Sequence, residues 1–255
     1  MKTARRALCL LVVVSVAVLA PHAEATARAT GVMVRLGAAE SGNWGGYNQG
    51  ILEQGKTSGF HQVSAQWVVP TASQHQGGRA EYSSAWVGIG GGCLNPSCLV
   101  GDNTLIQAGT NQDVDATGHA SYGAWWEIIP GPQITINTMQ VHAGDSMYAD
   151  VHEVVANSNV WVITVRNWTT GQVFKTKVPY TSTHATAEWI LETPIVIGTG
   201  GTGFAAMPNL PPTRFYDVKV NYAAASLKPR WSTRSRAKKC ALLSIKLSSN
   251  KAAYR

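Results

Sequence analysis

Residues 62–69 read QVSAQWVV, and every second residue from Val63 to Val69 is apolar. Side chains of a β-strand point to opposite faces in turn, so this alternation predicts a strand with one face in a hydrophobic core. Similar stretches, rich in Val, Ile, Trp and Tyr, recur at 83–89, 121–129, 147–155, 159–166 and 214–222. Clusters of Gly, Pro, Asn and Ser separate them, and no long amphipathic helix is visible. We therefore predict an all-β protein, an antiparallel two-sheet β-sandwich.

The N-terminus has the three parts of a signal peptide. Positively charged residues within 2–6 precede the apolar run 7–19, and small residues at 23–25 offer a cleavage point. The apolar run is too short for a membrane-spanning helix, which needs about 20 residues. We expect a signal peptide over 1–25 and a secreted protein with no stable membrane association. A retained membrane anchor is the alternative.

The rest of the chain divides into three parts by composition. Residues 26–40 have the composition of a leader or short pro-segment, and residues 41–225 contain all the alternating stretches. Residues 226–255 form a basic tail with nine Lys and Arg and no Asp or Glu, within a formal net charge of +7 for the whole chain. A nucleic-acid-binding domain gathers its basic residues on a folded face. We therefore expect no nucleic-acid partner, and a monomer with one folded domain. The tail fits a solvated arm or an arm that binds anionic surfaces.

The cysteines predict one short loop closure. Cys93 and Cys98 flank the turn-forming insert Leu-Asn-Pro-Ser. This spacing favours a disulfide formed in an oxidising compartment over half a zinc site, because no second ligand pair stands nearby. Cys240 has no evident partner. A glycosylation sequon begins at Asn167 and would matter only in a eukaryotic host.

The motifs of several enzyme classes are missing. The chain has no G-x-S-x-G elbow, no H-E-x-x-H, no phosphate-binding loop and no dinucleotide fingerprint. His184 and Glu188 are four residues apart, a spacing that could hold a metal on a helix, but this segment reads as a strand. We therefore expect no metal and no cofactor.

Four polar residues lie within aromatic or apolar strand-like segments: Gln107, Glu127, Glu188 and Glu192. If 187–192 is a strand, Glu188 and Glu192 share one face. Carboxylates at such positions are costly unless they are paired or hydrogen-bonded. Each of the four also has a purely structural interpretation, such as a strand end at solvent for Glu127 or a backbone partner for Gln107.

Seven short segments resemble, in the same order, those of the glutamic peptidases, or eqolisins. The resemblance covers about residues 41–222, and no single segment is decisive. It implies an acid-acting endopeptidase with a concanavalin-like, jelly-roll β-sandwich. The matching segments are Asn43-Trp44-Gly45-Gly46, Ala65-Gln66-Trp67-Val68-Val69-Pro70, Ala85-Trp86-Val87-Gly88-Ile89-Gly90, Leu105-Ile106-Gln107-Ala108-Gly109, Ala124-Trp125-Trp126-Glu127, Gly144-Asp145-Ser146 and Ala187-Glu188-Trp189-Ile190-Leu191-Glu192.

The resemblance also implies roles for single residues. The family's catalytic glutamine falls on Gln107 and its catalytic glutamate on Glu192. Four further residues fall on positions that line or support the substrate cleft: Trp44, Trp86, Trp125 and Glu127. Protein or peptide substrates are expected.

This chain departs from the family pattern in three places. Gly90 and Asn111 stand where the family usually or often has an acidic residue. The basic tail stands where the family normally ends on further β-strands. The first two departures put the pH optimum in question, and the third puts the closure of the sandwich in question.

Amide hydrolysis fits the implied pair. Glu192 would take a proton from water and return it to the leaving amine, while Gln107 would orient the water and donate to the oxyanion. Such a pair predicts that Gln107 and Glu192 lie on adjacent strands of one concave face. One alternative is a glycoside hydrolase using Glu127 and Glu192, which would need closely spaced carboxyls. The other is a non-catalytic carbohydrate-binding module whose tryptophans stack on sugars.

Overall fold

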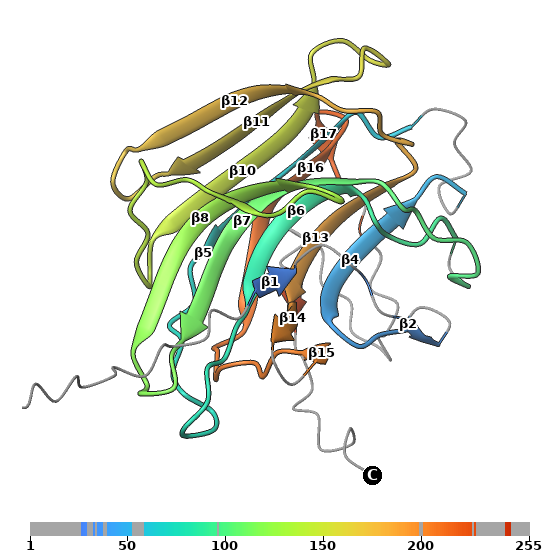
Figure 1. Ribbon diagram of the computed structural model, residues 1–255. Helices are drawn as coiled ribbons and strands as arrows, with labels where there is room; N and C mark the ends of the chain where they lie inside the picture. The colour runs from blue at the N-terminus through green and yellow to red at the C-terminus, as the bar shows by residue number, and fades with distance from the viewer. Residues whose placement is uncertain are drawn as a thin grey trace, which may run out of the picture.

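The protein is seen here as a computed structural model, shown in Figure 1. All regular structure in the described residues is β-strand. No helix in this part of the chain is long and apolar enough to cross a membrane. The structure describes residues 27–29, 33, 35–37, 40–52, 59–95, 97–198, 201–225, 227 and 243–245.

Two antiparallel sheets face one another, a front sheet and a back sheet as viewed in Figure 1. The front sheet has the strand order β4 (Trp44–Gly50), β13 (Thr186–Glu192), β6 (Ser84–Gly90), β7 (Leu105–Val114), β8 (Ala120–Ile128) and β9 (Ile134–Thr135). The back sheet has the order β12 (Val173–Pro179), β11 (Val160–Asn167), β10 (Ser146–Glu153), β5 (Gln62–Val68), β16 (Thr213–Val220) and β17 (Ala223–Ala224), and β18 (Leu243–Ile245) also pairs with β16. The predicted two-sheet sandwich is confirmed.

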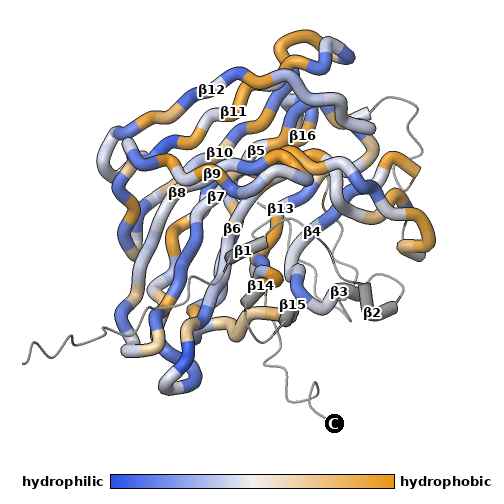
Figure 2. Tube along the Cα trace, in the orientation of Figure 1, coloured by the Kyte–Doolittle hydropathy of each residue, from blue (hydrophilic) through white to orange (hydrophobic). Residues whose placement is uncertain are grey.

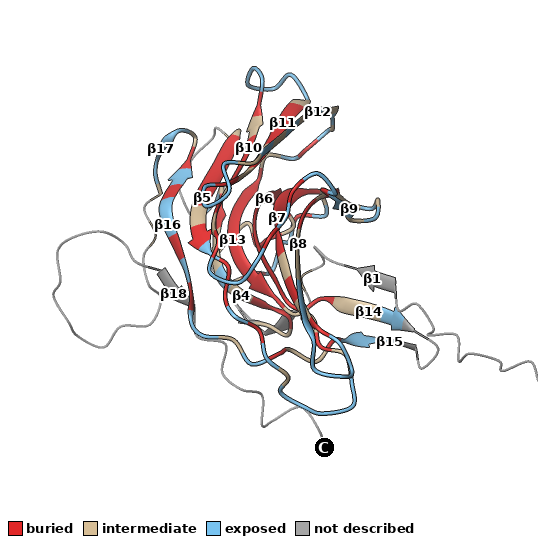
Figure 3. Cartoon of the chain, turned by 90° about the vertical axis from the view of Figure 1, so that its left-hand side faces the viewer, coloured by how far each residue is buried: buried red, intermediate tan, exposed pale blue. Residues whose placement is uncertain are grey.

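Two smaller sheets involve the N-terminal part of the described chain. In one, β14 (Ile195–Gly198) pairs with β1 (Ala27–Ala29) and with β15 (Gly201–Phe204). In the other, β2 (Arg35–Gly37) pairs with β3 (Glu40–Ser41). Strands β14 and β15 lie on the outer side of the front sheet, the side turned away from the back sheet (Figures 1 and 3).

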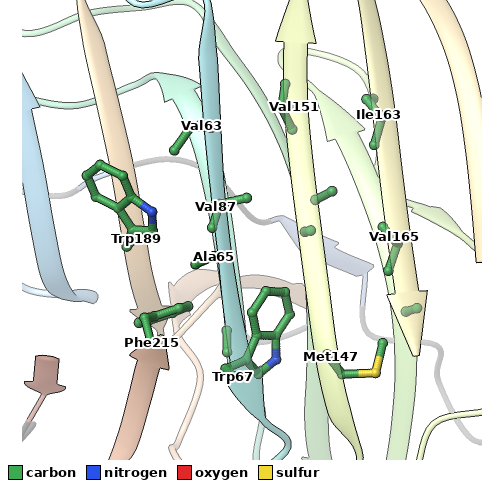
Figure 4. Close-up of a cluster of buried hydrophobic side chains, with 14 of the residues drawn as sticks. Val63, Ala65, Trp67, Val87, Met147, Val151, Ile163, Val165, Trp189 and Phe215 are labelled. Atoms are coloured by element: carbon green, nitrogen blue, oxygen red, sulfur yellow. The ribbon is translucent and has the colours of Figure 1, made fainter. Parts of the chain in front are cut away.

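The hydrophobic core fills the space between the two sheets. Val63, Ala65 and Trp67 of β5 are completely buried there, as the alternation in 62–69 predicts. Trp67 and Trp189 point into this layer from opposite sheets (Figure 4), and the Trp189 indole donates to the Ser64 carbonyl at 3.0 Å. Burying one large apolar side chain contributes about 1.5–3 kcal/mol. Because the core takes one face of each strand, only the opposite, outer face can carry functional side chains.

Hydrophobic and hydrophilic residues alternate along most strands in Figure 2. Burial in Figure 3 is greatest in the centre of the two sheets and falls towards the loops. Strand β13 is the exception to simple alternation, because all seven of its residues are buried. One of its faces packs in the core, and the other carries Glu188, Ile190 and Glu192.

The predicted disulfide is confirmed, because Cys93 and Cys98 are bonded with their Cα atoms 4.9 Å apart. Asn167 is completely buried, and its amide donates to the Gln140 carbonyl and to Asp145. The sequon at this residue is therefore closed to glycosylation in the folded chain. Cys240 lies outside the described residues.

Candidate active site

The outer face of the front sheet carries one row of polar side chains. Glu188 on β13 pairs with Gly88 on β6, Gly88 pairs with Gln107 on β7, and Gln107 pairs with Glu127 on β8. Asn48 on β4 pairs with Glu188 at the other end of the row. Directly paired residues of antiparallel strands share a face. These five residues, which we call the polar row, therefore point to the same side.

Glu127 fixes the orientation of the Gln107 amide. The Gln107 Nε2 donates to Glu127 Oε2 at 2.5 Å, and both side chains are buried. The amide nitrogen therefore faces Glu127 and the amide oxygen faces away from it. Gln107 Oε1 has no hydrogen-bond partner among the described residues. The amide therefore keeps one N–H and its whole carbonyl oxygen available for a ligand.

Glu188 is a completely buried carboxyl group. Burial raises its pKa well above the ordinary value, the Thr186 hydroxyl lowers it in part, and the Asp102 carboxylate raises it further. Neither Glu188 oxygen makes a hydrogen bond of regular geometry with any described residue. Buried polar groups are normally satisfied, and unsatisfied ones often mark a functional site. Glu188 is therefore a candidate functional carboxyl group, with its Oε1 on the side of Gly92 and Asn48.

Gly88 separates Glu188 from Gln107. A Cβ at this position would lie 3.1 Å from the Gln107 Cβ and 3.0 Å from the Trp86 ring. Neighbouring strands are about 4.8 Å apart, so Glu188 and Gln107 are two strand spacings apart, about 10 Å between Cα atoms. Two extended side chains of this length can span that distance, but Glu188 Oε1 here lies 2.5 Å from where a Cβ on Gly92 would stand, beside Asn48.

Glu192 occupies a different place. It pairs with Trp44 and Ser84, four residues along the strand from the polar row, which corresponds to about 13 Å. Its Oε2 accepts a hydrogen bond from the Trp86 indole at 2.8 Å, and its Oε1 accepts a long one, 3.5 Å, from Asn43. Strand β6 stands between β13 and β7, so the expectation that Gln107 and Glu192 lie on adjacent strands is wrong. They do share one face, but Glu188 is the carboxyl in register with Gln107.

The three tryptophans expected to line the cleft meet in one cluster beside the polar row. Trp44, Trp86 and Trp125 pack with Leu105 and Ile190 on the outer face of the front sheet. The ring centroids of Trp44 and Trp86 are 4.9 Å apart in an edge-to-face arrangement. The indole nitrogens of Trp44 and Trp125 lack partners among the described residues. We call these five residues the aromatic cluster.

The aromatic cluster is closed to solvent in the full-length chain. Trp86 and Trp125 are completely buried, and Trp44 is 7% exposed. Met33, from the segment expected to be a leader, and Ile129 pack against the cluster. Rings without exposed area cannot stack on a sugar, which removes the support for a carbohydrate-binding surface at these residues in this form of the chain.

The spacing of Glu127 and Glu192 also fails to support a glycosidase pair. Two strands, β6 and β7, stand between them. The separation is about 14 Å across the sheet and a further ~13 Å along it. Glycosidases hold their carboxyls about 5–9.5 Å apart.

One of the two single-residue departures from the family pattern, Gly90, has a structural reason. Gly90 has a φ of +97°, and a Cβ there would lie 2.0 Å from the Thr104 carbonyl oxygen. An acidic residue therefore cannot replace it without moving the backbone. Asn111 donates to Asp113 at 2.7 Å, so a carboxyl group is still present beside that position.

An antiparallel two-sheet sandwich with buried carboxyl and carboxamide groups in one row of its outer face is an arrangement suited to a hydrolase. The comparisons specify it. The chain matches the Peptidase A4 family over residues 42–253 and belongs to that family. It is a glutamic endopeptidase acting on protein or peptide substrates, as the resemblance to eqolisins implied.

Solved structures agree with the family. Scytalido-glutamic peptidase, crystallised with a peptide-based transition state analog, is 26% identical with a TM-score of 0.54, covering 70% of this chain and 79% of that chain. A further structure of scytalido-glutamic peptidase, with a transition state analog inhibitor, is 25% identical with a TM-score of 0.54, covering 73% and 83%. The fold is shared with SCP-B, an eqolisin family member in complex with the tripeptide Ala-Ile-His, at 24% identity and a TM-score of 0.51, covering 72% and 82%. No match was found among curated proteins.

Proposed function

We propose that Glu188, with Gln107, activates the water that attacks the scissile peptide bond. The observation that carries this proposal is the polar row, in which these two side chains share a register and only a glycine lies between them. Both have buried polar atoms without partners among the described residues. Glu192, the base implied by the family resemblance, is held by Trp86 instead.

In this mechanism ionised Glu188 takes a proton from the water as the water attacks the carbonyl carbon. The Gln107 carbonyl oxygen orients the same water, and its remaining N–H donates to the oxyanion that forms. Protonated Glu188 then gives its proton to the leaving amine. Each proton is therefore accounted for by one carboxyl group, with the amide as a fixed dipole.

Two further carboxyl groups position the site. Glu127 fixes the Gln107 amide so that Nε2 and Oε1 cannot exchange places. Glu192 accepts a hydrogen bond from the Trp86 indole. Trp86 pairs with Ile190, which lies midway between Glu188 and Glu192 on the same face of β13. We propose that Glu192 sets the position of the aromatic wall against which a substrate side chain packs.

We propose an acidic working range. Three carboxyl groups, Glu127, Glu188 and Glu192, are buried on one face of the front sheet, and no Lys or Arg is among the buried side chains of the described residues. Burying several carboxylates together is least costly when some are protonated. Acid conditions favour that state, and opening of the cleft to water would lower the pKa of Glu188 so that it can act as base.

We propose that residues 26–40 are a pro-segment that covers the substrate cleft, and that the protein is secreted. Met33 packs on the aromatic cluster, and residues 27–29 add a strand to β14 beside the front sheet. A cleft must open to admit a peptide, whereas Gln107 and Glu188 have no exposed surface in the full-length chain. The Cys93–Cys98 disulfide is consistent with an oxidising, extracytoplasmic compartment.

A digestion assay tests the proposed pair. Purified protein starting at residue 41 should hydrolyse an unfolded protein at about pH 2–5 and lose activity towards about pH 8. Gln107→Ala should lower turnover about 100-fold or more, as expected for loss of an oxyanion donor. Glu127→Gln should cause a smaller loss, because the amide stays but its orientation is no longer fixed. Unchanged turnover in Gln107→Ala would remove Gln107 from the mechanism.

A further inference from the structure

A second group of functional side chains lies outside the polar row and the aromatic cluster. It is formed by His61 just before β5, Glu153 at the end of β10, and His184 just before β13. His61 Nδ1 is 2.7 Å and His184 Nε2 is 3.1 Å from the same oxygen, Glu153 Oε2. The three ligand atoms all lie within 4.8 Å of one another. Two imidazoles and one carboxylate therefore converge on a single point.

Hydrogen bonding alone does not account well for this convergence. Glu153 Oε2 also lies 2.8 Å from the Asn157 backbone nitrogen, and Oε1 accepts from the Asn159 backbone nitrogen at 2.6 Å. A carboxylate offers about two acceptor positions per oxygen. Three donors on Oε2 are one too many. If a cation sat between the imidazoles and Oε2, the imidazoles would turn their lone pairs to it, and the Asn157 N–H would keep its acceptor.

The backbone holds the two histidines in place before any ligand binds. His184 has a φ of +57°, a conformation that is uncommon for residues other than glycine and is often found at functional sites. Its carbonyl accepts from the Phe60 backbone nitrogen at 2.8 Å, and its ring stacks on Trp161 with centroids 5.4 Å apart. The His61 backbone nitrogen donates to Asn221 at 2.7 Å. The site is therefore preorganised by contacts with the back sheet and its loops.

We propose that His61, Glu153 and His184 form a binding site for a divalent cation of the zinc type. Two imidazoles and one carboxylate are a recognised ligand set for Zn²⁺, which then keeps a fourth position for water. His61 and His184 are 19% and 12% exposed, which leaves a path for that water. The backbone N–H groups on Glu153 supply the outer hydrogen bonds that usually orient a metal-binding carboxylate.

The cation would connect the two sheets rather than take part in peptide hydrolysis. His61 and Glu153 belong to the back sheet, and His184 leads into β13 of the front sheet. Glu188 stands four residues beyond His184, or about 13 Å along the strand. The expected effect is a gain in stability that is independent of the active site and of the function proposed above.

Zinc titration of the purified protein tests the site. With Zn²⁺ alone as the probe, near neutral pH, calorimetry should give one ion per chain. At a free concentration about 100 times the Kd, the Tm should rise by roughly 5–10 °C. Failure of the wild type to bind Zn²⁺ or to shift its Tm would overturn the proposal.

Variants assign the ion to these residues. His61→Gln and His184→Asn should each abolish the zinc-dependent Tm shift, and asparagine is chosen at 184 because it tolerates positive φ. His142→Gln is the matched control, because His142 is 69% exposed beside Asp145, away from the cluster, and it should keep the shift. A shift retained by both cluster variants, or lost in the control, would contradict the proposal. An X-ray absorption spectrum of the zinc-loaded wild type requires no variant and should show two imidazole ligands. A zinc coordination sphere that contains sulfur or lacks imidazole would also overturn the site.

Discussion

A carboxyl group without exposed surface prefers its neutral form, and Glu188 is in this position. Burial raises its pKa well above that of a free glutamate, and Asp102 raises it further. In the closed, full-length chain Glu188 therefore tends to hold its proton. Opening of the cleft to water would lower the pKa and restore the ionised form that a base requires.

The raised pKa predicts a pH-dependent stability difference between wild type and Glu188→Gln. Above about pH 4.3 the unfolded chain has released this proton, while the folded chain keeps it up to its raised pKa. The free energy of unfolding of the wild type therefore falls as pH rises through this window, by up to about 1.4 kcal/mol per pH unit. Glu188→Gln lacks the proton and should gain stability relative to the wild type as pH rises. Urea unfolding of both full-length proteins at about pH 4, 5.5 and 7 measures the difference; parallel stability curves would show that the folded pKa is not raised.

At the scale of the element, β6 sets the distance between the two side chains of the proposed pair. Gly88 leaves only a narrow gap above the strand, bordered by the Leu105, Trp86 and Gln107 side chains. In the proposed site the strand therefore supplies this gap and, through Trp86, the wall beside it. Any side chain at residue 88 would enter this gap.

We predict that Gly88→Ala lowers kcat by at least about tenfold with little effect on folding. The new methyl group would stand 3.0–3.1 Å from Leu105, Trp86 and Gln107, tight enough to move the Gln107 side chain by a few tenths of an ångström. Displacements of about 1 Å at a reacting centre can cost 100-fold in rate. Gly77→Ala is the control, because nothing lies within 4 Å of a Cβ there. Equal kcat values for the two variants and the wild type would show that the gap is not used.

The strands could be predicted from the sequence because their signal is local. The stretch 62–69 becomes β5 (Gln62–Val68), and 159–166 becomes β11 (Val160–Asn167), since alternation alone decides the burial of each face. Strand β12 escaped notice, because this strand at the edge of the back sheet has no buried residue and reads Val-Phe-Lys-Thr-Lys-Val-Pro.

The proposed pairing of Glu188 with Gln107 could not be predicted in the same way. Glu188 and Glu192 differ by four residues and share a face, so the sequence of β13 does not distinguish them. The choice depends on the register of β13 against β6 and of β6 against β7, which is set by contacts between distant residues. The His61, Glu153 and His184 cluster was missed for the same reason, since these residues are far apart in the chain. In both cases the missing information was which distant segments of the chain lie next to each other in the fold.

At the scale of the whole molecule, described segments near both termini pair with strands that are distant in the sequence. Residues 27–29 pair with β14, and residues 243–245 pair with β16. The family match also extends to residue 253, beyond the predicted domain boundary at 225. We propose that the tail contributes an edge strand to the back sheet in addition to its basic charge.

We predict that Met33→Asp activates the full-length protein. A carboxylate on the aromatic cluster would be desolvated without a partner, so the segment should detach from the cleft. The initial rate of peptide hydrolysis by the uncut chain should rise at least about tenfold towards that of protein starting at residue 41, with chain length followed by mass spectrometry. Val155→Asp, at a 66% exposed apolar position, is the control and should leave the rate unchanged. If uncut wild type is already as active as the shortened protein, the segment does not cover the cleft.

The most direct test compares Glu188→Gln and Glu192→Gln in protein starting at residue 41, by measuring kcat and KM for one peptide at its optimal pH. Glu188→Gln should lose at least about 1000-fold in kcat, because an amide cannot take a proton from water. Glu192→Gln keeps an acceptor for the Trp86 indole and should retain kcat within about tenfold, with the larger change in KM. Full activity in Glu188→Gln, or loss of activity only in Glu192→Gln, would contradict the assignment of Glu188 as the base.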